Sequence, residues 1–550
     1  MNLVGQIVDR ILGLPPARVR EAAIEVERNL AIPMPDGAVL LADRYRPSGR
    51  AAMPAVLVRT PYGRRGLGGA VFGAAYARQG LQVVVQSVRG TFGSGGEFRP
   101  LHQEKEDGLA TAAWLRAQPW CDGRLATAGL SYFGYTQWAL GPYLDPPLEA
   151  VCLGVTTSEF NSHHYPGGSF ALHGALSWSA LTSLQEAAPL GGILLGRRQA
   201  RRTAQAMAHL PLREADTVAI GRPSAFWQDV VGHSEPGDGF WAAADHSAAV
   251  AGLTSPATMV TGWHDLFLPW QLRDFRTLSD AGRTARITIG PWAHADLPAL
   301  KAQILDQASW LRAHLLGDAV PERAPVRVHL QHARSWREFT QWPPPQSTPT
   351  PLYLRQDGAL DWRSPPSAGS DRFTYDPADP TPTVGGPLID GKNKQQDNRA
   401  IEARPDVLVY STSPLQRDLD VLGEVRARVH VRTDPGHADV FVRLCDVDER
   451  GVSRNVCDGI LRLRPGSPPP GEDGAVAADI EMWPTGYRFL RGHRIRVLVA
   501  GGAFPRFPRN HGTGEPVADA VTMRPCLHEV LHDPAHPSHV LVPVLADGDR

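Results

Sequence analysis

A short segment around Ser131 has the residues of a serine nucleophile held on a tight turn. It reads Gly-Leu-Ser-Tyr-Phe-Gly at 129–134, follows a short apolar run at 125–128 and precedes a helix-like stretch at 135–140. A strand, a sharp turn and a helix are the context expected of a nucleophile elbow. The usual signature has its second glycine two residues after the serine, whereas Phe133 stands there in this chain. Because glycines flank the turn, the backbone can hold the Ser131 hydroxyl above the end of a sheet.

Two loops farther along the chain supply a carboxylate and an imidazole in the order that acyl transfer by a serine requires. Such chemistry needs a hydroxyl, a base, a carboxylate that orients the base, and donors for the oxyanion. In sheet-type hydrolases the triad runs Ser, Asp, His along the chain. Here Thr-Gly-Trp-His-Asp at 261–265 and Gly-Pro-Trp-Ala-His at 290–294 each follow a predicted strand. Asp265 and His294 therefore fall at the sheet edge where open α/β sheets place their sites.

Each of these residues also has an ordinary structural interpretation. Ser131 alone could be a turn serine, and Asp265 could cap a helix, since Asp is favoured there. His264, next to the carboxylate, could in principle be the base, but that position favours a supporting role in the loop. The occurrence of all three residue types in the expected order favours a triad, because a triad is recognised by roles.

The elements that must position these residues alternate between strands and helices up to about residue 160. Alternation of this kind predicts a mostly parallel sheet covered by helices on both faces. Strands are predicted at 26–34, 38–45, 55–58, 81–85, 125–128 and 150–155, and helices at 69–78 and 108–117.

The alternation stops at 161–250, where alanine, leucine and arginine predict several helices, the clearest at 193–210. Strands resume at 257–260 and 287–289, and a long helix is predicted at 300–316. The helical segment is therefore expected to be an insertion that forms a cap over the site.

A proline-rich linker at 342–351 is followed by short strands separated by Gly and Pro turns. This pattern predicts an all-β sandwich or jelly roll. The expected organisation is an α/β-hydrolase domain in two parts, 1–160 and 251–345, a helical cap at 161–250, and a jelly-roll domain at 346–550.

Composition excludes several other classes of protein. The chain of 550 residues is too long to fold around a single hydrophobic core. Its hydrophobic fraction of 42% suits a globular protein, and its net charge of −1 favours no nucleic-acid partner. No apolar run approaches the roughly 18 residues of a spanning helix, and residues 1–20 lack a signal-peptide pattern. The five scattered cysteines form no C-x-x-C pair. These features predict a cytoplasmic protein without membrane or nucleic-acid partners; a homodimer is left open.

The three motifs together resemble those of the hydrolase family of cocaine esterase and the X-prolyl dipeptidyl-peptidases, often called CocE/NonD. The segments Arg-Thr-Pro-Tyr at 59–62 and Trp-Cys-Asp-Gly at 120–123 are also similar to that family. The resemblance spans most of the chain, since 346–550 resembles the family's jelly-roll domain.

The resemblance implies a role for each matching residue. Ser131 would be the nucleophile, His294 the general base and then acid, and Asp265 the orienting carboxylate. The oxyanion hole would be the hydroxyl of Tyr62 and the backbone N–H of Tyr132. Tyr62 also has the alternative of being a packed core residue.

Three further positions bear on the substrate. Relatives acting on α-amino acid esters carry Glu directly after the Ser-Tyr pair, where this chain has Phe133. A neutral or apolar acyl group is therefore favoured, and Phe133 is expected to contact it. Phe267 matches an aromatic residue of the family's acyl pocket, and Trp178 on the cap is expected to add to it. Both could instead fill the core, as aromatic residues often do.

The chain also departs from the family in one loop. The family has Asp-x-Arg-Gly after the next strand, whereas this chain has Ser87-Val88-Arg89-Gly90. Ser87 cannot supply the charge that an Asp gives to a neighbouring arginine, which leaves the geometry of this loop open without touching the triad.

The sequence therefore predicts a serine hydrolase that cleaves a small-molecule carboxylic ester through an acyl-serine, with no cofactor and no metal. His163-His164 is not a metal pair in this interpretation, because adjacent helical residues face different ways. One alternative is an X-prolyl dipeptidyl-peptidase or other amidase, for which Glu159 is a candidate acid without an evident partner. Another is a binding protein with a lapsed hydrolase domain and a carbohydrate-reading jelly roll. We also expect the jelly roll to contribute to the pocket rim.

Overall fold

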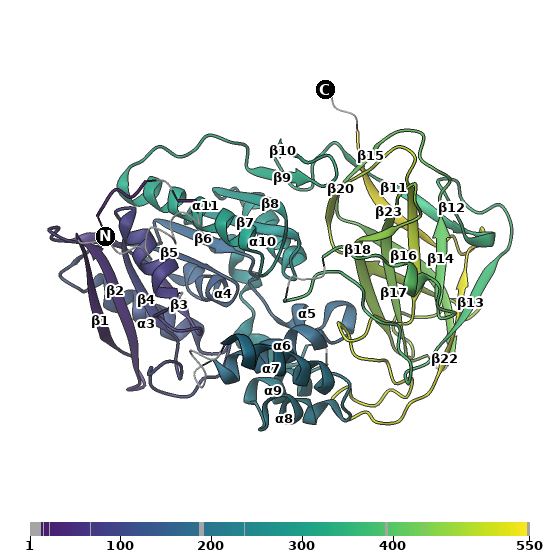
Figure 1. Cartoon of the computed structure of the whole chain (residues 1–550), viewed down its shortest axis with the longest axis horizontal. Helices are drawn as coiled ribbons and strands as arrows, with labels where there is room; N and C mark the ends of the chain where they lie inside the picture. Colours follow the sequence, from purple (N-terminus) through teal and green to yellow (C-terminus); the bar gives the residue numbers. More distant parts are fainter. Residues whose placement is uncertain are drawn as a thin grey trace.

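The computed structural model has a helix-covered sheet on one side and an all-β region on the other, with a group of helices beside both (Figure 1). It describes residues 13–546 except for 15, 21–22, 67, 186–191, 236, 391–393 and 435. Most of the amino-terminal segment considered for a signal peptide lies outside the described residues. None of the helices among these residues has the length and apolar composition that a bilayer-spanning segment requires.

The first sheet contains the strands that lead to the turn at Ser131 and to the loops of Asp265 and His294. Its described strands lie in the order β1-β2-β4-β3-β5-β6-β7-β8-β9-β10. Neighbours from β4 and β3 through β9 pair in parallel, and β1, β2 and β10 pair antiparallel at the edges. Every residue of β3 and of β7 is buried, as expected for strands covered on both faces. The strands are β1 (Ile24–Pro33), β2 (Val39–Pro47), β3 (Met53–Thr60), β4 (Gln82–Ser87), β5 (Cys121–Leu130), β6 (Ala150–Gly154), β7 (Ala257–His264), β8 (Ala285–Ala293), β9 (Val326–Leu330) and β10 (Ser335–Phe339).

Helices cover the sheet on both sides. On one face α2 and α11 pack through residues such as Tyr76, Ile304 and Leu311. On the other face α3 and α10 pack through residues such as Leu115 and Phe275. The helices are η2 (Gly69–Ala74), α2 (Ala75–Arg78), α3 (Glu104–Arg116), α4 (Tyr132–Trp138), α10 (Leu268–Asp280) and α11 (Leu297–Leu316).

A helical segment separates β6 from β7 and has a core of its own. Its buried residues include Phe170, Leu176 and Trp227, and the same cluster contains Tyr132 and Phe267 from the sheet domain. The segment therefore packs directly on the loops at the carboxyl edge of the sheet. Its helices are α5 (Asn161–His164), α6 (Leu172–Leu184), α7 (Gly192–Ala206), α8 (Ala215–Ile220) and α9 (Ala225–Gly232).

In the remaining chain nearly all of the regular secondary structure described is strand. Its described strands form one interconnected set with antiparallel pairing apart from a single parallel bridge between β12 and β14. Trp263 of β7 packs against Trp342, and the buried cluster that contains both continues into the all-β region. The elements are β11 (Ser347–Arg355), β12 (Ala359–Asp361), β13 (Ser370–Tyr375), α12 (Arg399–Glu402), β14 (Val407–Ser411), β15 (Leu419–Gly423), β16 (Arg426–Asp434), β17 (Ala438–Val447), β18 (Ser453–Leu463), β19 (Val476–Glu481), β20 (Thr485–Phe489), β21 (Arg494–Ala500), β22 (Cys526–Leu531) and β23 (His539–Leu545).

Candidate active site

Ser131 occupies a sharp turn between β5 and α4. Its backbone has φ 56° and ψ −126°, a conformation that a non-glycine residue rarely adopts and that tends to occur at functional sites. The turn brings backbone atoms close together: a Cβ at position 129 would lie 2.3 Å from the carbonyl oxygen of Phe133. A Cβ at position 134 would lie 2.6 Å from Cβ of Thr156. Glycine is therefore required at both 129 and 134.

The structure brings Ser131, Asp265 and His294 into one hydrogen-bonded chain. Nδ1 of His294 lies 2.8 Å from Oδ2 of Asp265, and Nε2 of His294 lies 3.0 Å from Oγ of Ser131. The carboxylate of Asp265 is fully buried, and its Oδ1 accepts a 2.7 Å hydrogen bond from the N–H of Phe267. A proton on Nδ1, shared with the carboxylate, leaves Nε2 free to accept the proton of the Ser131 hydroxyl.

The loops that carry the acid and the base touch each other. A Cβ at Gly262 would lie 2.2 Å from the carbonyl oxygen of Trp292, and one at Gly290 would lie 2.4 Å from the Trp292 ring. Trp292 thus packs over the ends of two adjacent strands, where only glycine leaves room for its ring and its carbonyl group. This close packing accounts for the glycines in both motifs and fixes the distance between Asp265 and His294.

The backbone N–H of Tyr132 is available for an oxyanion. Tyr132 is the first residue of α4, so its N–H has no acceptor within the helix. Its phenol is anchored at the other end, donating a 2.7 Å hydrogen bond to Glu104 and accepting one of 2.9 Å from the N–H of Leu101. Glu104 in turn lies 3.0 Å from the guanidinium of Arg59. These contacts hold Tyr132 in place behind Ser131.

The hydroxyl of Tyr62 lies beside Ser131. It accepts a 2.8 Å hydrogen bond from Nε1 of Trp178, and the Ser131 side chain is close enough to favour its ionised form. Burial raises the pKa of Tyr62 to about 12, so the phenol keeps its proton at neutral pH. Because Trp178 donates to the phenol oxygen, the proton of Tyr62 remains available for an acceptor on the Ser131 side.

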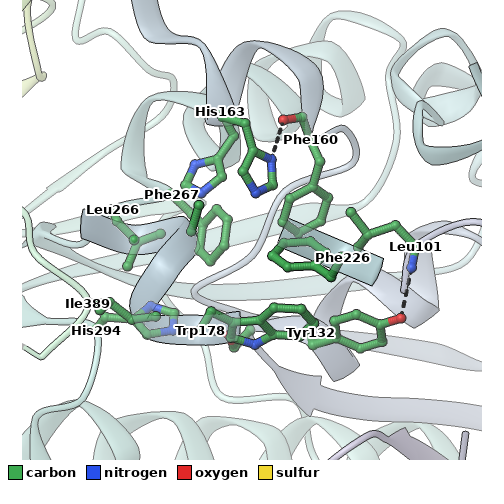
Figure 2. Close-up of a pocket in the computed structure, with 14 residues that line it drawn as sticks. Leu101, Tyr132, Phe160, His163, Trp178, Phe226, Leu266, Phe267, His294 and Ile389 are labelled. Atoms are coloured by element: carbon green, nitrogen blue, oxygen red, sulfur yellow. Dashed lines mark hydrogen bonds between the residues drawn. The ribbon is translucent and has the colours of Figure 1, made fainter. Parts of the chain in front are cut away.

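A compact cavity of about 50 Å³ opens beside Ser131 and His294, with room for a few water molecules. Its wall is mostly aromatic (Figure 2) and includes Phe267 and Trp178, the latter stacked on Tyr132 at a ring distance of 5.7 Å. Ile389 of the all-β region also lies on the wall, as expected for a region that contributes to the pocket rim. The lining residues are Leu101, Ser131, Tyr132, Phe160, His163, His164, Gly174, Ala175, Trp178, Phe226, Leu266, Phe267, His294 and Ile389.

Phe133 differs from the sequence-based expectation. It is not among the cavity residues, and its ring packs edge-on against Phe72 at 5.1 Å and Tyr62 at 6.0 Å. The turn at Ser131 sends consecutive side chains to opposite sides, so Tyr132 faces the cavity and Phe133 enters the core under β5. Phe133 therefore supports Tyr62 from behind and does not touch a substrate in the cavity.

Two other residues considered from the sequence lie away from the cavity. The ring of His264 is buried against Gln331, with Nε2 3.0 Å from Oε1, and burial lowers its pKa to about 4. Glu159 is paired with Arg273 at 2.9 Å and accepts a hydrogen bond from the N–H of Ser162. His264 therefore has a structural role beside Asp265. The charge of Glu159 is balanced by the guanidinium of Arg273.

The loop that departs from the family pattern is held by other carboxylates. Arg89 forms a two-point ion pair with Asp107, at 2.6 and 3.0 Å, and a further one with Asp36 at 2.6 Å. Ser87 accepts a hydrogen bond from Arg64 at 3.3 Å. The charge that an Asp at position 87 would provide is therefore supplied to Arg89 from two other segments.

The all-β region also holds the loops of the acid and the base. Nε1 of Trp483 donates a 3.1 Å hydrogen bond to the carbonyl oxygen of Asp265. Lys394 forms an ion pair with Asp296, which accepts a 3.0 Å hydrogen bond from the N–H of Ala293, next to His294. The site is thus assembled from both halves of the chain.

Sequence reasoning missed several residues of the cavity. Leu266 and Ile389 carry no recognisable motif, and His163 was considered only for metal binding. Among the described residues, no group of three or more His, Cys, Asp or Glu side chains is arranged to hold a metal ion. The available sequence signal for these residues was the pair His163-His164, which lies in α5.

Comparisons with known proteins cover nearly the whole chain. A family model described as X-Pro dipeptidyl-peptidase (S15 family) matches residues 36–296, and the X-Pro dipeptidyl-peptidase C-terminal non-catalytic domain matches 318–541. Cocaine esterase from a Rhodococcus species is 33% identical, and the alignment covers 94% of this chain and 98% of that protein.

Solved structures show the same architecture at full length. An α-amino acid ester hydrolase superposes with a TM-score of 0.79 at 22% identity, covering 96% of this chain and 98% of that one. An aminopeptidase from a Thaumarchaeota archaeon superposes with a TM-score of 0.78, also at 22% identity and with the same shares covered. These matches confirm the predicted class, an α/β-hydrolase domain followed by an all-β domain.

Proposed function

Because this chain belongs to the family of ester and peptide hydrolases that includes cocaine esterase and the S15 X-Pro dipeptidyl-peptidases, we propose that it is a serine esterase using Ser131, His294 and Asp265. The observation that carries the proposal is the unbroken hydrogen-bonded chain from Asp265 through His294 to Ser131, at 2.8 and 3.0 Å. It ends at a cavity with aromatic walls, which suits the acyl part of an uncharged ester.

In the first step Oγ of Ser131 attacks the ester carbonyl carbon while Nε2 of His294 takes the hydroxyl proton. Asp265 stabilises the imidazolium that forms, since its carboxylate holds Nδ1 at 2.8 Å. The N–H of Tyr132 and the O–H of Tyr62 donate to the carbonyl oxygen as it becomes negative. The carbon–oxygen bond to the alcohol then breaks, and His294 gives its proton to the leaving oxygen.

In the second step water replaces the alcohol. His294 takes a proton from the water, the hydroxide oxygen bonds to the acyl carbon, and the bond to Oγ of Ser131 breaks as His294 returns the proton to Ser131. The products are a carboxylic acid and the free enzyme. The ester and one water molecule are the reactants in this balance of atoms and protons.

The lining of the cavity favours a neutral ester over a substrate with a free amino group. Among its described lining residues there is no carboxylate, and Glu159, the candidate acid for the peptidase alternative, is engaged by Arg273 at 2.9 Å. An amine in an aromatic cavity without a negative partner would lose its hydration without compensation. We therefore place an uncharged acyl group in this cavity.

Labelling with a fluorophosphonate probe tests the assigned nucleophile. We expect the wild-type chain to be labelled and the Ser131→Ala variant not to be labelled. An unlabelled wild-type chain would overturn the proposal and favour the carbohydrate-binding alternative. Comparing a p-nitrophenyl acyl ester with an Xaa-Pro p-nitroanilide separates the two hydrolase alternatives: Ser131-dependent release from the ester is expected, and faster release from the anilide would overturn the assignment as an esterase.

The jelly-roll topology and a cytoplasmic location remain predictions from the sequence, and a homodimer remains open. Size-exclusion chromatography with light scattering measures the last of these.

A further inference from the structure

The carbonyl oxygen of Ser131 accepts three hydrogen bonds at the turn. Two come from the backbone N–H groups of Gly134 and Tyr135, at 2.9 and 3.0 Å, in the first turn of α4. The third comes from the hydroxyl of Thr156, whose Oγ1 donates at 2.9 Å. Thr156 is fully buried and follows β6, the strand that pairs in parallel with β5. The residue after one strand thus supports the turn at the end of the neighbouring strand.

The backbone adopts a strained conformation where it places Thr156. Val155 has φ 36°, in a region that a β-branched residue rarely occupies. Its N–H donates to the carbonyl oxygen of Val260 at 2.9 Å, and the N–H of Thr156 donates to Oε1 of Gln271 at 3.2 Å. Gln271 belongs to α10, the helix that follows the loop of Asp265. Strain of this kind persists where the surrounding contacts impose it, and it tends to occur at functional sites.

The carbonyl of Ser131 and the N–H of Tyr132 belong to the same peptide unit. A trans peptide is planar, so its C=O and its N–H point in opposite directions. Holding the oxygen on Thr156 and on α4 therefore directs the N–H of Tyr132 outward from the start of the helix. Hydrogen bonds to the oxygen also polarise the peptide, because linked hydrogen bonds strengthen one another. The N–H of Tyr132 is thereby both fixed in direction and made a better donor.

We propose that Thr156 is a positioning residue for the oxyanion hole and acts on the N–H of Tyr132 through the carbonyl of Ser131. The inference rests on the proposed function and deepens it by adding a residue from outside the cavity. Thr156 is not among the residues that line the cavity, so its effect reaches the substrate through the peptide. Because the negative oxygen exists only in the transition state, the effect falls on kcat and leaves KM nearly unchanged.

The test compares Thr156→Val with Thr156→Ser in steady-state hydrolysis of a p-nitrophenyl acyl ester. Valine keeps the shape of the side chain and removes the hydroxyl. Two N–H donors still satisfy the Ser131 oxygen in this variant, so the turn should persist. Shape matters here, because a Cβ at Gly134 would already lie 2.6 Å from Cβ of Thr156 and a larger side chain would not fit.

The expected loss follows from the share of Thr156 in holding the peptide. Loss of a whole oxyanion donor costs about 10²–10³ in rate, and the Thr156 hydroxyl supplies one of the three bonds to the Ser131 oxygen. One third of that free energy corresponds to a fall in kcat of about five- to tenfold in Thr156→Val. Thr156→Ser keeps a hydroxyl donor and should restore kcat to within about twofold of wild type. Should Thr156→Val fail to fold, Thr156→Ala against Thr156→Ser gives the same comparison.

The next residue, Thr157, provides a matched control. It is also fully buried, and its Oγ1 also donates to a backbone oxygen at 2.9 Å, that of Glu159. Thr157→Val should lose stability in urea unfolding, as Thr156→Val does, and should keep kcat. A loss of kcat in Thr157→Val as large as in Thr156→Val would overturn the inference, because the effect would then follow from the loss of any buried hydroxyl in this segment.

A transition-state analogue measures the oxyanion hole directly. Trifluoroacetone forms a reversible adduct in which Oγ of Ser131 bonds to the carbonyl carbon, the hydroxyl proton passes to His294 and the ketone oxygen becomes negative. Its inhibition constant should rise in Thr156→Val by the same factor by which kcat/KM falls. An unchanged inhibition constant together with a lower kcat would overturn the role of Thr156 in the oxyanion hole.

Failure of the inference differs from failure of the proposed function. A Thr156→Val enzyme with the kcat of wild type, and with Ser131-dependent hydrolysis intact, would overturn the role of Thr156 and leave the esterase standing. Absence of Ser131-dependent hydrolysis of every ester, together with absence of fluorophosphonate labelling of the wild-type chain, would overturn the proposed function and the inference with it.

Discussion

Replacing Tyr62 with phenylalanine removes one of the two proposed oxyanion donors while keeping the ring. Trp178 already donates to the phenol oxygen at 2.8 Å, so the phenol proton is the part of Tyr62 that can serve the substrate. The substitution also preserves the edge-on packing of the ring on Phe133 at 6.0 Å. The change is therefore confined to one hydroxyl group beside Ser131.

The magnitude follows from what is lost in the transition state. With the N–H of Tyr132 left as the remaining donor, kcat should fall by about 10²–10³, or about 2.7–4 kcal/mol. KM should change little, because the negative oxygen exists only in the transition state. A separate and smaller cost falls on folding, since Nε1 of Trp178 loses its acceptor, at about 1 kcal/mol if water from the cavity replaces it.

Steady-state hydrolysis of a p-nitrophenyl acyl ester measures the first effect, and urea unfolding measures the second. The matched control is Tyr410→Phe, which removes a buried phenol that donates to Asp371 at 2.7 Å in the all-β region. The control should lose stability and keep kcat. A Tyr62→Phe enzyme with kcat within threefold of wild type would refute the assignment of Tyr62 to the oxyanion hole.

Three other predictions follow from the geometry. Asp265→Asn should lower kcat by about 10⁴ without unfolding the chain, because the amide favours the wrong tautomer of His294; activity within tenfold of wild type would contradict the triad. Gly129→Ala should destabilise the fold by about 3 kcal/mol in urea unfolding, since its Cβ would lie 2.3 Å from a backbone oxygen. The control Gly196→Ala, in open space within α7, should instead stabilise the fold by about 0.5–1 kcal/mol. Burial lowers the pKa of His246 and of His264 to about 4. The unfolded chain, titrating near 6.5, then binds more protons, so stability should fall as pH falls from 6.5 to 4. His246→Gln should flatten that slope in thermal unfolding at several pH values, and an unchanged slope would contradict the assignment.

The residues with chemical roles were accessible from the sequence because each sits in a local motif. The elbow at Ser131, the Gly-Trp-His-Asp loop and the Gly-Pro-Trp-Ala-His loop all follow apolar runs that read as strands. Parallel strands end at one edge of a sheet, so short-range signals were enough to predict three distant side chains at the same edge. The structure shows in addition why the glycines are needed, through contacts such as that between Gly262 and Trp292.

The lining of the cavity was not accessible in the same way. Phe133 was expected there, but the turn at Ser131 sends its ring into the core, and side-chain direction at a strained turn has no sequence period. Ile389 reaches the cavity from a loop more than 250 positions after Ser131, which only the packing of two domains determines. The place of His163 on the cavity wall is a property of its surroundings and leaves no trace in residue spacing.

The hydrogen bond from Trp483 to the acid loop and the ion pair from Lys394 to Asp296 make the two halves of the chain interdependent. A break in the second half would release the acid and the base while the sheet behind them stayed intact. Inactivation by heat or proteolysis would then begin where these two contacts join the halves of the chain. To prolong the life of the enzyme at high temperature, strengthening these contacts is a better approach than changing the core of either half.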